Sequence, residues 1–184
     1  MIKFERISHI FFISAFIVLL TACPQPQQYP PEPQIEFNKV TLSDKTDLLG
    51  NPLKNYQLSF KFIDGDGDIG LRPSDTTGVF SADSVFYNNL FLKLYKIKNG
   101  KKVIVNDTLT YRTKYIQPIG QNKTLKAEIL IDYPFEYKAN HKLKYDTVMF
   151  EFYMADRQQH LSNVDSTLRL FIDTVGVFYR EKPE

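Results

Sequence analysis

Residues 56–62 read Tyr-Gln-Leu-Ser-Phe-Lys-Phe, an alternation of apolar and polar side chains that decides the fold class. Successive side chains of a β-strand point to opposite faces, so this stretch would carry one apolar face formed by Tyr56, Leu58, Phe60 and Phe62. A strand with one apolar and one polar face is typical of an antiparallel sheet that covers a core on one side.

The same period of two recurs along the chain, and no window shows a sustained helical period. Asn99-Gly100 lies between two apolar runs and is a strong signal for a tight hairpin turn. The pattern predicts roughly seven or eight short strands, at residues 35–42, 56–62, 90–97, 103–105, 108–116, 125–131, 148–154 and 168–172.

This strand inventory favours an all-β fold, an antiparallel immunoglobulin-like β-sandwich. A closed β-barrel is the structural alternative. The formal net charge is only +2, and no basic stripe is interleaved with aromatic residues, so the composition argues against a nucleic-acid partner.

The N-terminus has the parts of a secretory signal, namely a short basic start, an apolar run over residues 10–20 and small residues before Cys23. The apolar run is shorter than the roughly 20 residues that a membrane-spanning helix needs. Leu20-Thr21-Ala22-Cys23 resembles the bacterial lipobox. That resemblance implies that residues 1–22 are cleaved and that Cys23 receives a lipid that anchors the protein to a bilayer.

Cys23 is the only cysteine, so the chain has no intramolecular disulfide. Residues 24–33 contain five prolines, and we therefore expect residues 23–34 to form an extended spacer. Residues 35–184 remain as a single β-sandwich domain.

The strand at 56–62 runs into Asp64-Gly65-Asp66-Gly67-Asp68, where three carboxylates alternate with glycines. In the spacing of an EF-hand loop, Asp64, Asp66 and Asp68 fill positions one, three and five, and Asp75 fills position twelve. Ile69 replaces the glycine of that loop, Asp75 replaces its bidentate glutamate and the flanking helices are missing, so an EF-hand proper is not predicted. The favoured interpretation is a solvated acidic turn, and a looser calcium loop between strands is the alternative. Carboxylate catalysis is weaker still, because the loop is polar and glycine-rich.

A second polar stretch, residues 156–163, resembles the turn Asp-x-x-Gly-Asn-x-Ser of bacterial immunoglobulin-like domains. Gln159 and His160 stand where that turn has Gly and Asn. We expect a turn pinned by the side chains of Asp156 and Asn163, with a second set of calcium ligands at Asp156 as the alternative.

Together, the lipobox, the proline-rich spacer, the motif at residues 60–70 and the sequence Phe-Tyr-Met-Ala-Asp-Arg at 152–157 resemble uncharacterised lipoproteins of Bacteroidota. The resemblance implies an immunoglobulin-like domain in the cell envelope and brings no established activity. The short Pro-Gln run after Cys23, in place of an acidic one, favours the periplasmic side of the outer membrane over the cell surface.

These observations predict a non-enzymatic binding module in the envelope, with an unknown envelope protein or glycan as partner and with the acidic loop as a candidate calcium site. A small metal-assisted hydrolase that uses Asp64 or Asp68 is one alternative. A carbohydrate-binding accessory lipoprotein is another.

Overall fold

The computed structural model describes residues 27–119, 122–136 and 146–180. The predicted signal peptide and the predicted lipidation site at Cys23 lie outside these residues. Within them the chain forms nine strands and two 3₁₀ turns. The elements are β1 (Gln34–Thr46), β2 (Pro52–Asp64), η1 (Gly78–Phe80), η2 (Val85–Tyr87), β3 (Leu90–Lys98), β4 (Lys101–Tyr111), β5 (Leu125–Glu136), β6 (Thr147–Met154), β7 (Asp165–Ser166), β8 (Leu170–Phe171) and β9 (Gly176–Tyr179).

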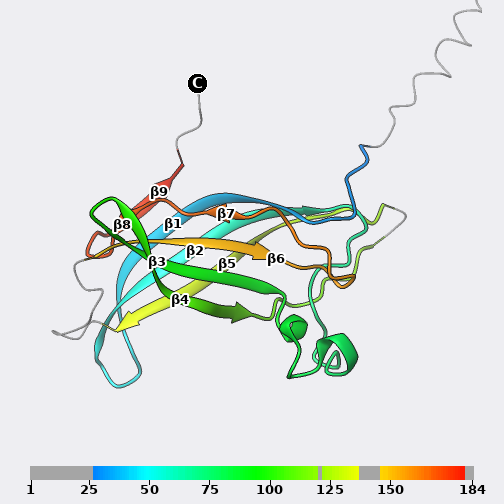
Figure 1. Cartoon of the computed structure of the whole chain (residues 1–184), viewed down its shortest axis with the longest axis horizontal. Coiled ribbons are helices and arrows are strands. Elements are labelled where there is room, and N and C mark those ends of the chain that lie inside the picture. Colours follow the sequence, from blue (N-terminus) through cyan, green and yellow to red (C-terminus); the bar gives the residue numbers. More distant parts are fainter. Residues whose placement is uncertain (1–26, 120–121, 137–145, 181–184) are drawn as a thin grey trace, which may run out of the picture.

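The strands form two antiparallel sheets that pack as a sandwich, as predicted (Figure 1). The first sheet has the order β5-β2-β1-β9, and the second has the order β4-β3-β6-β7 with β8 also paired to β6. Strands β1, β2 and β5 thus face β3, β6 and β7, which is the A-B-E against C-F-G arrangement of immunoglobulin-like sandwiches. The described residues include no helix with the length and apolarity needed to cross a bilayer.

The core lies between the sheets and is built from the alternating residues that the sequence pattern singled out. Tyr56, Leu58, Phe60 and Phe62 of β2 are all buried, with exposed fractions of 2% or less. The ring of Phe60 packs on that of Phe152 in β6 at a centroid distance of 4.9 Å. Burial of such aromatic faces on both sides of the interface is the main force that holds the two sheets together.

The hairpin between β3 and β4 has its turn at Asn99 and Gly100, as predicted, with positive φ angles of 50° and 75°. The two strands predicted at 103–105 and 108–116 are one strand, β4, which ends at Tyr111. Beyond it, the backbone of Thr113 turns away from β3, because its N–H donates to the side chain of Asn89 and its carbonyl accepts from Leu71. The prediction of a strand up to residue 116 was therefore wrong.

The strand predicted at 168–172 is also different, because only β8, residues 170–171, lies within it. β7 comes earlier, at residues 165–166, and the two short strands pair with β6 with a shift in register between them. The Thr167 side chain lies at the break, where its hydroxyl accepts hydrogen bonds from the Phe150 N–H and from the buried Tyr56 hydroxyl, both at 2.9 Å. Strand β9 follows and completes the edge of the first sheet next to β1; the sequence pattern did not predict it.

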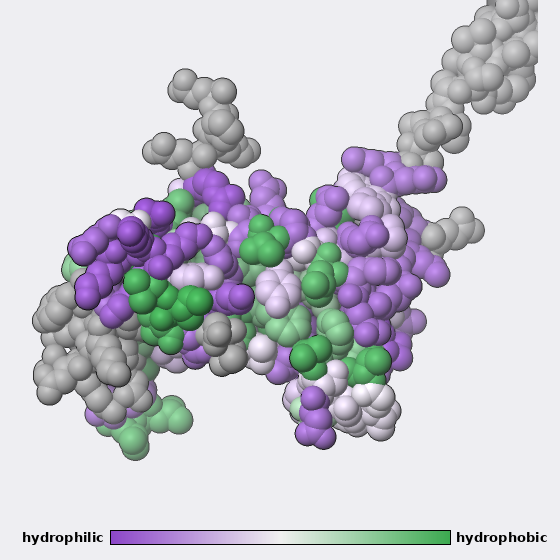
Figure 2. Space-filling model, in the orientation of Figure 1, coloured by the Kyte–Doolittle hydropathy of each residue, from purple (hydrophilic) through white to green (hydrophobic). Residues whose placement is uncertain are grey.

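The two ends of the sandwich differ in character. Strands β2 and β6 both end at the right of Figure 1, where the chain also enters β1, whereas the β1–β2 hairpin turns at the lower left. Leu48 and Leu49 at that hairpin tip are exposed to 105% and 87%, and hydrophobic colour marks the tip in Figure 2. The acidic loop and the entry of the chain therefore share one end of the domain.

Candidate metal site

The acidic loop begins inside the fold, because Asp64 is the last residue of β2 and has no solvent exposure. The loop curls back at once, and the Asp68 N–H donates a hydrogen bond of 2.8 Å to Asp64 Oδ2. An isolated β-bridge then joins Ile69 to Asp156, directly after the end of β6. The backbone thus ties the loop after β2 to the turn after β6.

This bridge brings three carboxylates together. Asp64, Asp68 and Asp156 each offer an oxygen, and these oxygens lie within 4.8 Å of one another. Asp156 is 2% exposed and Asp68 is partly buried. The described residues therefore contain a buried carboxylate cluster that can hold a metal ion.

Several oxygens of the loop have no partner among the described residues. Asp64 Oδ1, Asp66 Oδ1 and Asp68 Oδ1 are all buried and accept no hydrogen bond. Buried polar atoms in folded proteins nearly always have a partner, so three orphaned carboxylate oxygens in one loop call for an explanation. A cation bound between them supplies one.

Electrostatics point the same way. Burial, reinforced by the neighbouring charge of Asp66, raises the pKa of Asp64 to about 7. Burial and the charge of Asp156 also raise the pKa of Asp68. Both shifts mean that the folded chain disfavours the ionised carboxylates unless a positive charge compensates them.

The polar neighbours of the cluster supply only part of that compensation. Gln158 Nε2 donates to Asp66 Oδ2 at 2.7 Å and to Asp68 Oδ2 at 3.3 Å. Asp156 Oδ1 accepts from the His160 N–H at 2.8 Å, and Asp156 Oδ2 lies 2.7 Å from His160 Nδ1. The contact with Asp156 raises the pKa of His160.

Asp75, the fourth predicted ligand, lies elsewhere. Its Oδ2 accepts a 2.7 Å hydrogen bond from the Arg72 N–H and pairs with the guanidinium of Arg157. The hydrogen bond from Arg157 lowers the pKa of Asp75 to about 2. The structure therefore brings Asp64 and Asp68 together, with Asp66 beside them through Gln158. Asp156, and not Asp75, is the third carboxylate of the cluster.

The turn after β6 is pinned by Asp156, as expected, through its hydrogen bond from the His160 N–H. Gln159 has a positive φ of 70°, at the position where the similar turn has glycine. Asn163 acts differently from the prediction, because its side chain binds both backbone groups of Ile35 at the start of β1.

The end of the spacer packs directly on the acidic loop. The Gly65 N–H donates a 3.0 Å hydrogen bond to the Pro30 carbonyl. A Cβ at Gly65 would lie 2.3 Å from that oxygen, so only glycine allows this approach. The ammonium group of Lys126 lies 4.1 Å from the ring centroid of Tyr29 and holds the same segment in place.

Comparison with family models, curated proteins and solved structures finds no significant match to this chain. The fold and the carboxylate cluster therefore rest on the structure itself, and the resemblance to lipoproteins of Bacteroidota stays a prediction.

Proposed function

We propose that this protein is a non-enzymatic interaction module of the cell envelope, anchored through a lipid on Cys23 and stabilised by a calcium ion in its acidic loop. One observation carries the calcium site: Asp64 Oδ1 is fully buried, has no hydrogen-bond partner among the described residues and belongs to a carboxylate that converges with Asp68 and Asp156.

The donor set favours calcium over other common ions. Hard divalent cations prefer oxygen ligands, and Ca²⁺ accepts the irregular geometry that a loop between strands can offer, whereas Mg²⁺ demands a near-ideal octahedron. The converging ligands are three carboxylates and include no sulfur or nitrogen, which disfavours zinc. Asp66 Oδ1 is a further candidate ligand, because it is buried and unpartnered beside them.

The geometry gives less support to a metal-assisted hydrolase. Such an enzyme needs carboxylates that a substrate can reach, but Asp64 and Asp156 are 0% and 2% exposed. Three surface cavities of about 450, 440 and 490 Å³ lie over the described residues, and none of the three is lined by Asp64, Asp68 or Asp156. No specific contact favours the hydrolase as a second proposal.

Thermal unfolding of the purified protein in excess calcium and in chelator tests the site. At a calcium concentration 100 times the Kd, binding adds about 2.7 kcal/mol, which for a chain of this length raises the melting temperature by roughly 5–10 °C. Asp68→Asn should remove most of this shift. Asp83→Asn, a change at an exposed carboxylate outside the cluster, should keep it.

A melting temperature that does not respond to calcium would refute the site. An equal response in Asp68→Asn would show that calcium acts elsewhere on the chain. Equal shifts with magnesium and calcium would leave a divalent-cation site but contradict the choice of calcium.

A further inference from the structure

The two sheets have long free edges at β5 and β4, and these edges differ in regularity. Strand β5 pairs with β2 without a register shift, from Leu53 opposite Glu136 to Asp64 opposite Leu125. The pairing of β3 with β4 contains two register shifts. Bulges protect a sheet edge from further pairing, so among the described strands β5 offers the longer regular edge.

The opposite edges of both sheets are short. Strand β9 spans four residues, and β7 and β8 span two each. Short edge strands are another way in which proteins prevent unwanted pairing. The edge of β5 has neither protection, and only Pro134 near its end lacks an N–H. The regular stretch before Pro134 is therefore a template for an added strand.

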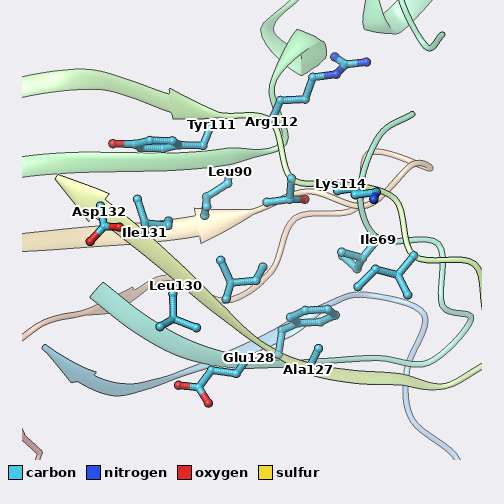
Figure 3. A pocket seen from close by; sticks show the side chains of 14 residues that line it. Ile69, Leu90, Tyr111, Arg112, Lys114, Ala127, Glu128, Leu130, Ile131 and Asp132 are labelled. Atoms are coloured by element: carbon cyan, nitrogen blue, oxygen red, sulfur yellow. The ribbon is translucent and has the colours of Figure 1, made fainter. Parts of the chain in front are cut away.

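A slot runs along that edge. It has a volume of about 450 Å³ and is lined by six consecutive residues of β5, from Ala127 to Asp132. Its opposite wall is the segment from Tyr111 to Ile116, which leaves β4 (Figure 3). A cavity that follows consecutive residues of one strand has the shape of a missing neighbouring strand.

The floor of the slot is the hydrophobic core. Phe62, Ile69 and Leu90 line it and are at most 2% exposed. Ala127 and Ile129 are only partly buried and pack against the same core from β5. Apolar side chains would therefore be favoured at the inward-facing positions of anything that fills the slot.

We propose that the slot binds an extended peptide segment of a partner protein, which adds to the first sheet as a strand beside β5. Constant-type immunoglobulin domains have a fourth strand at this position of the sheet, next to the strand that corresponds to β5. The peptide's backbone pairs with the free edge, and every second side chain enters the slot.

The free backbone groups along the slot favour a peptide over a lipid acyl chain as its occupant. Within the described residues β5 pairs only with β2, so each second residue of the lining stretch 127–132 presents an N–H and a C=O that need partners. An acyl chain would cover the apolar floor but leave these groups without partners. Glu128 and Asp132 of β5 also line the slot, but their carboxylates already accept hydrogen bonds from the side chains of Ser59 and Asn55. The exposed Lys114 stands on the opposite wall and forms no ion pair with the described residues, so an acidic side chain at that end of the peptide adds charge complementarity.

The proposal rests on the interaction role proposed above, but not on the calcium site. Selection from a display library of random twelve-residue peptides tests it, with the purified protein as target in calcium and again in chelator. We expect enrichment of peptides in which apolar and polar residues alternate. Ala127→Arg, which fills the slot, should weaken binding at least about tenfold, whereas Val177→Arg on the β9 edge should not.

A second measurement does not depend on how well the slot variant folds. Methylation of alternate backbone nitrogens of an enriched peptide removes donors that a β-strand needs, and it should abolish binding. Hydrogen exchange at residues 127–131 should slow when the unmethylated peptide is bound.

Three outcomes would overturn the proposal. One is that no peptide binds the wild-type protein more tightly than it binds the Ala127→Arg variant. Another is that methylated peptides bind as tightly as unmethylated ones. The third is that the protein forms a dimer which itself protects residues 127–131, since the occupant would then be a second copy. If the same peptides are enriched in chelator, the slot binds peptides whether or not the calcium site exists, and the two proposals can fail independently.

Discussion

Asp64 has a buried negative charge that the metal-free fold does not compensate. Because its pKa is raised to about 7, its ionised form is disfavoured in the folded chain at higher pH. Asp64→Asn should therefore stabilise the calcium-free protein at pH 8, by at most about 4 kcal/mol, and at the same time remove the stabilisation by calcium. Denaturant unfolding in chelator and in calcium measures both effects.

The stability difference between Asp64→Asn and the wild-type chain should depend on pH, and this dependence is the control for the prediction. The advantage of Asp64→Asn over the wild-type chain should be absent near pH 4 and grow as the pH rises to about 7, because the wild-type carboxyl is protonated in the fold at the lower pH. A variant that is less stable than the wild-type chain at pH 8 in chelator would contradict the assignment.

Asp75 should respond to pH in the opposite sense. Its pKa is lowered to about 2 by the hydrogen bond from Arg157, so its ionised form stabilises the fold above its ordinary pKa near 4. That stabilisation should be lost as the pH falls from about 4 to about 2. In Asp75→Asn the free energy of unfolding should fall less steeply than in the wild-type chain between about pH 4 and about pH 2. Urea unfolding at a series of pH values measures this difference. An unchanged profile would mean that the ion pair with Arg157 contributes nothing.

At the scale of elements, the spacer and the acidic loop form one unit through the contact of Gly65 with Pro30. Gly65→Ala places a methyl group 2.3 Å from the Pro30 carbonyl and should displace residues 27–33 from the loop. We expect faster amide hydrogen exchange at residue 65 and the residues next to it, and faster proteolysis near Tyr29. The β-sandwich should remain folded.

Gly50→Ala is the control, because a Cβ at Gly50 meets no atom within 4 Å, although the positive φ of 82° means that alanine strains this turn locally. It changes a glycine in the distant β1–β2 turn and should leave proteolysis near Tyr29 as in the wild-type chain. Equal exposure of the spacer in the Gly65→Ala and wild-type proteins would show that the contact does not hold it.

The sequence predicted those strands whose position depends on a pattern within a few consecutive residues. It missed the features that depend on contacts between distant parts of the chain. The alternation over 56–62 predicted β2, since the face of each side chain follows from its place in the strand. The break at Thr167 was missed because it depends on a hydroxyl that pairs with Phe150 and Tyr56, far away in the chain. Strand β9 was missed because it spans only four residues at a sheet edge, none of them buried.

The candidate metal site likewise contains residues that a local pattern identified and one residue that only the fold brings in. The alternating aspartates made Asp64, Asp66 and Asp68 candidate cation ligands, because their chemistry is visible in one short segment. Asp156 joins them only because β2 and β6 end at the same side of the sandwich, which no local pattern reveals. Asp75 was assigned by the spacing of an EF-hand, and in the folded chain Arg157 binds it instead.

At the scale of the whole molecule, the predicted location depends on Cys23. Cys23→Ala should move the protein from the membrane fraction to the soluble fraction of bacterial cells and abolish labelling with radioactive palmitate. Fractionation and labelling of the two proteins, expressed side by side, check this. Membrane retention of the unlabelled variant would show that another part of the chain provides the anchor.

The placement of β1 has a mechanical consequence for a chain tethered at its N-terminus. If Cys23 carries the proposed anchor, a pull on that end first loads the contacts of Tyr29 and Pro30. A pull directed along β1 then loads its pairing with β2, from Gln34 opposite Ile63 to Thr46 opposite Pro52. Such a load shears the whole ladder at once and does not unzip it bond by bond. If a partner held in the slot beside β5 were drawn away from the membrane, tension would pass through β5, β2 and β1, all within the first sheet. The second sheet, with its interrupted edge at β7 and β8, would carry little of the force.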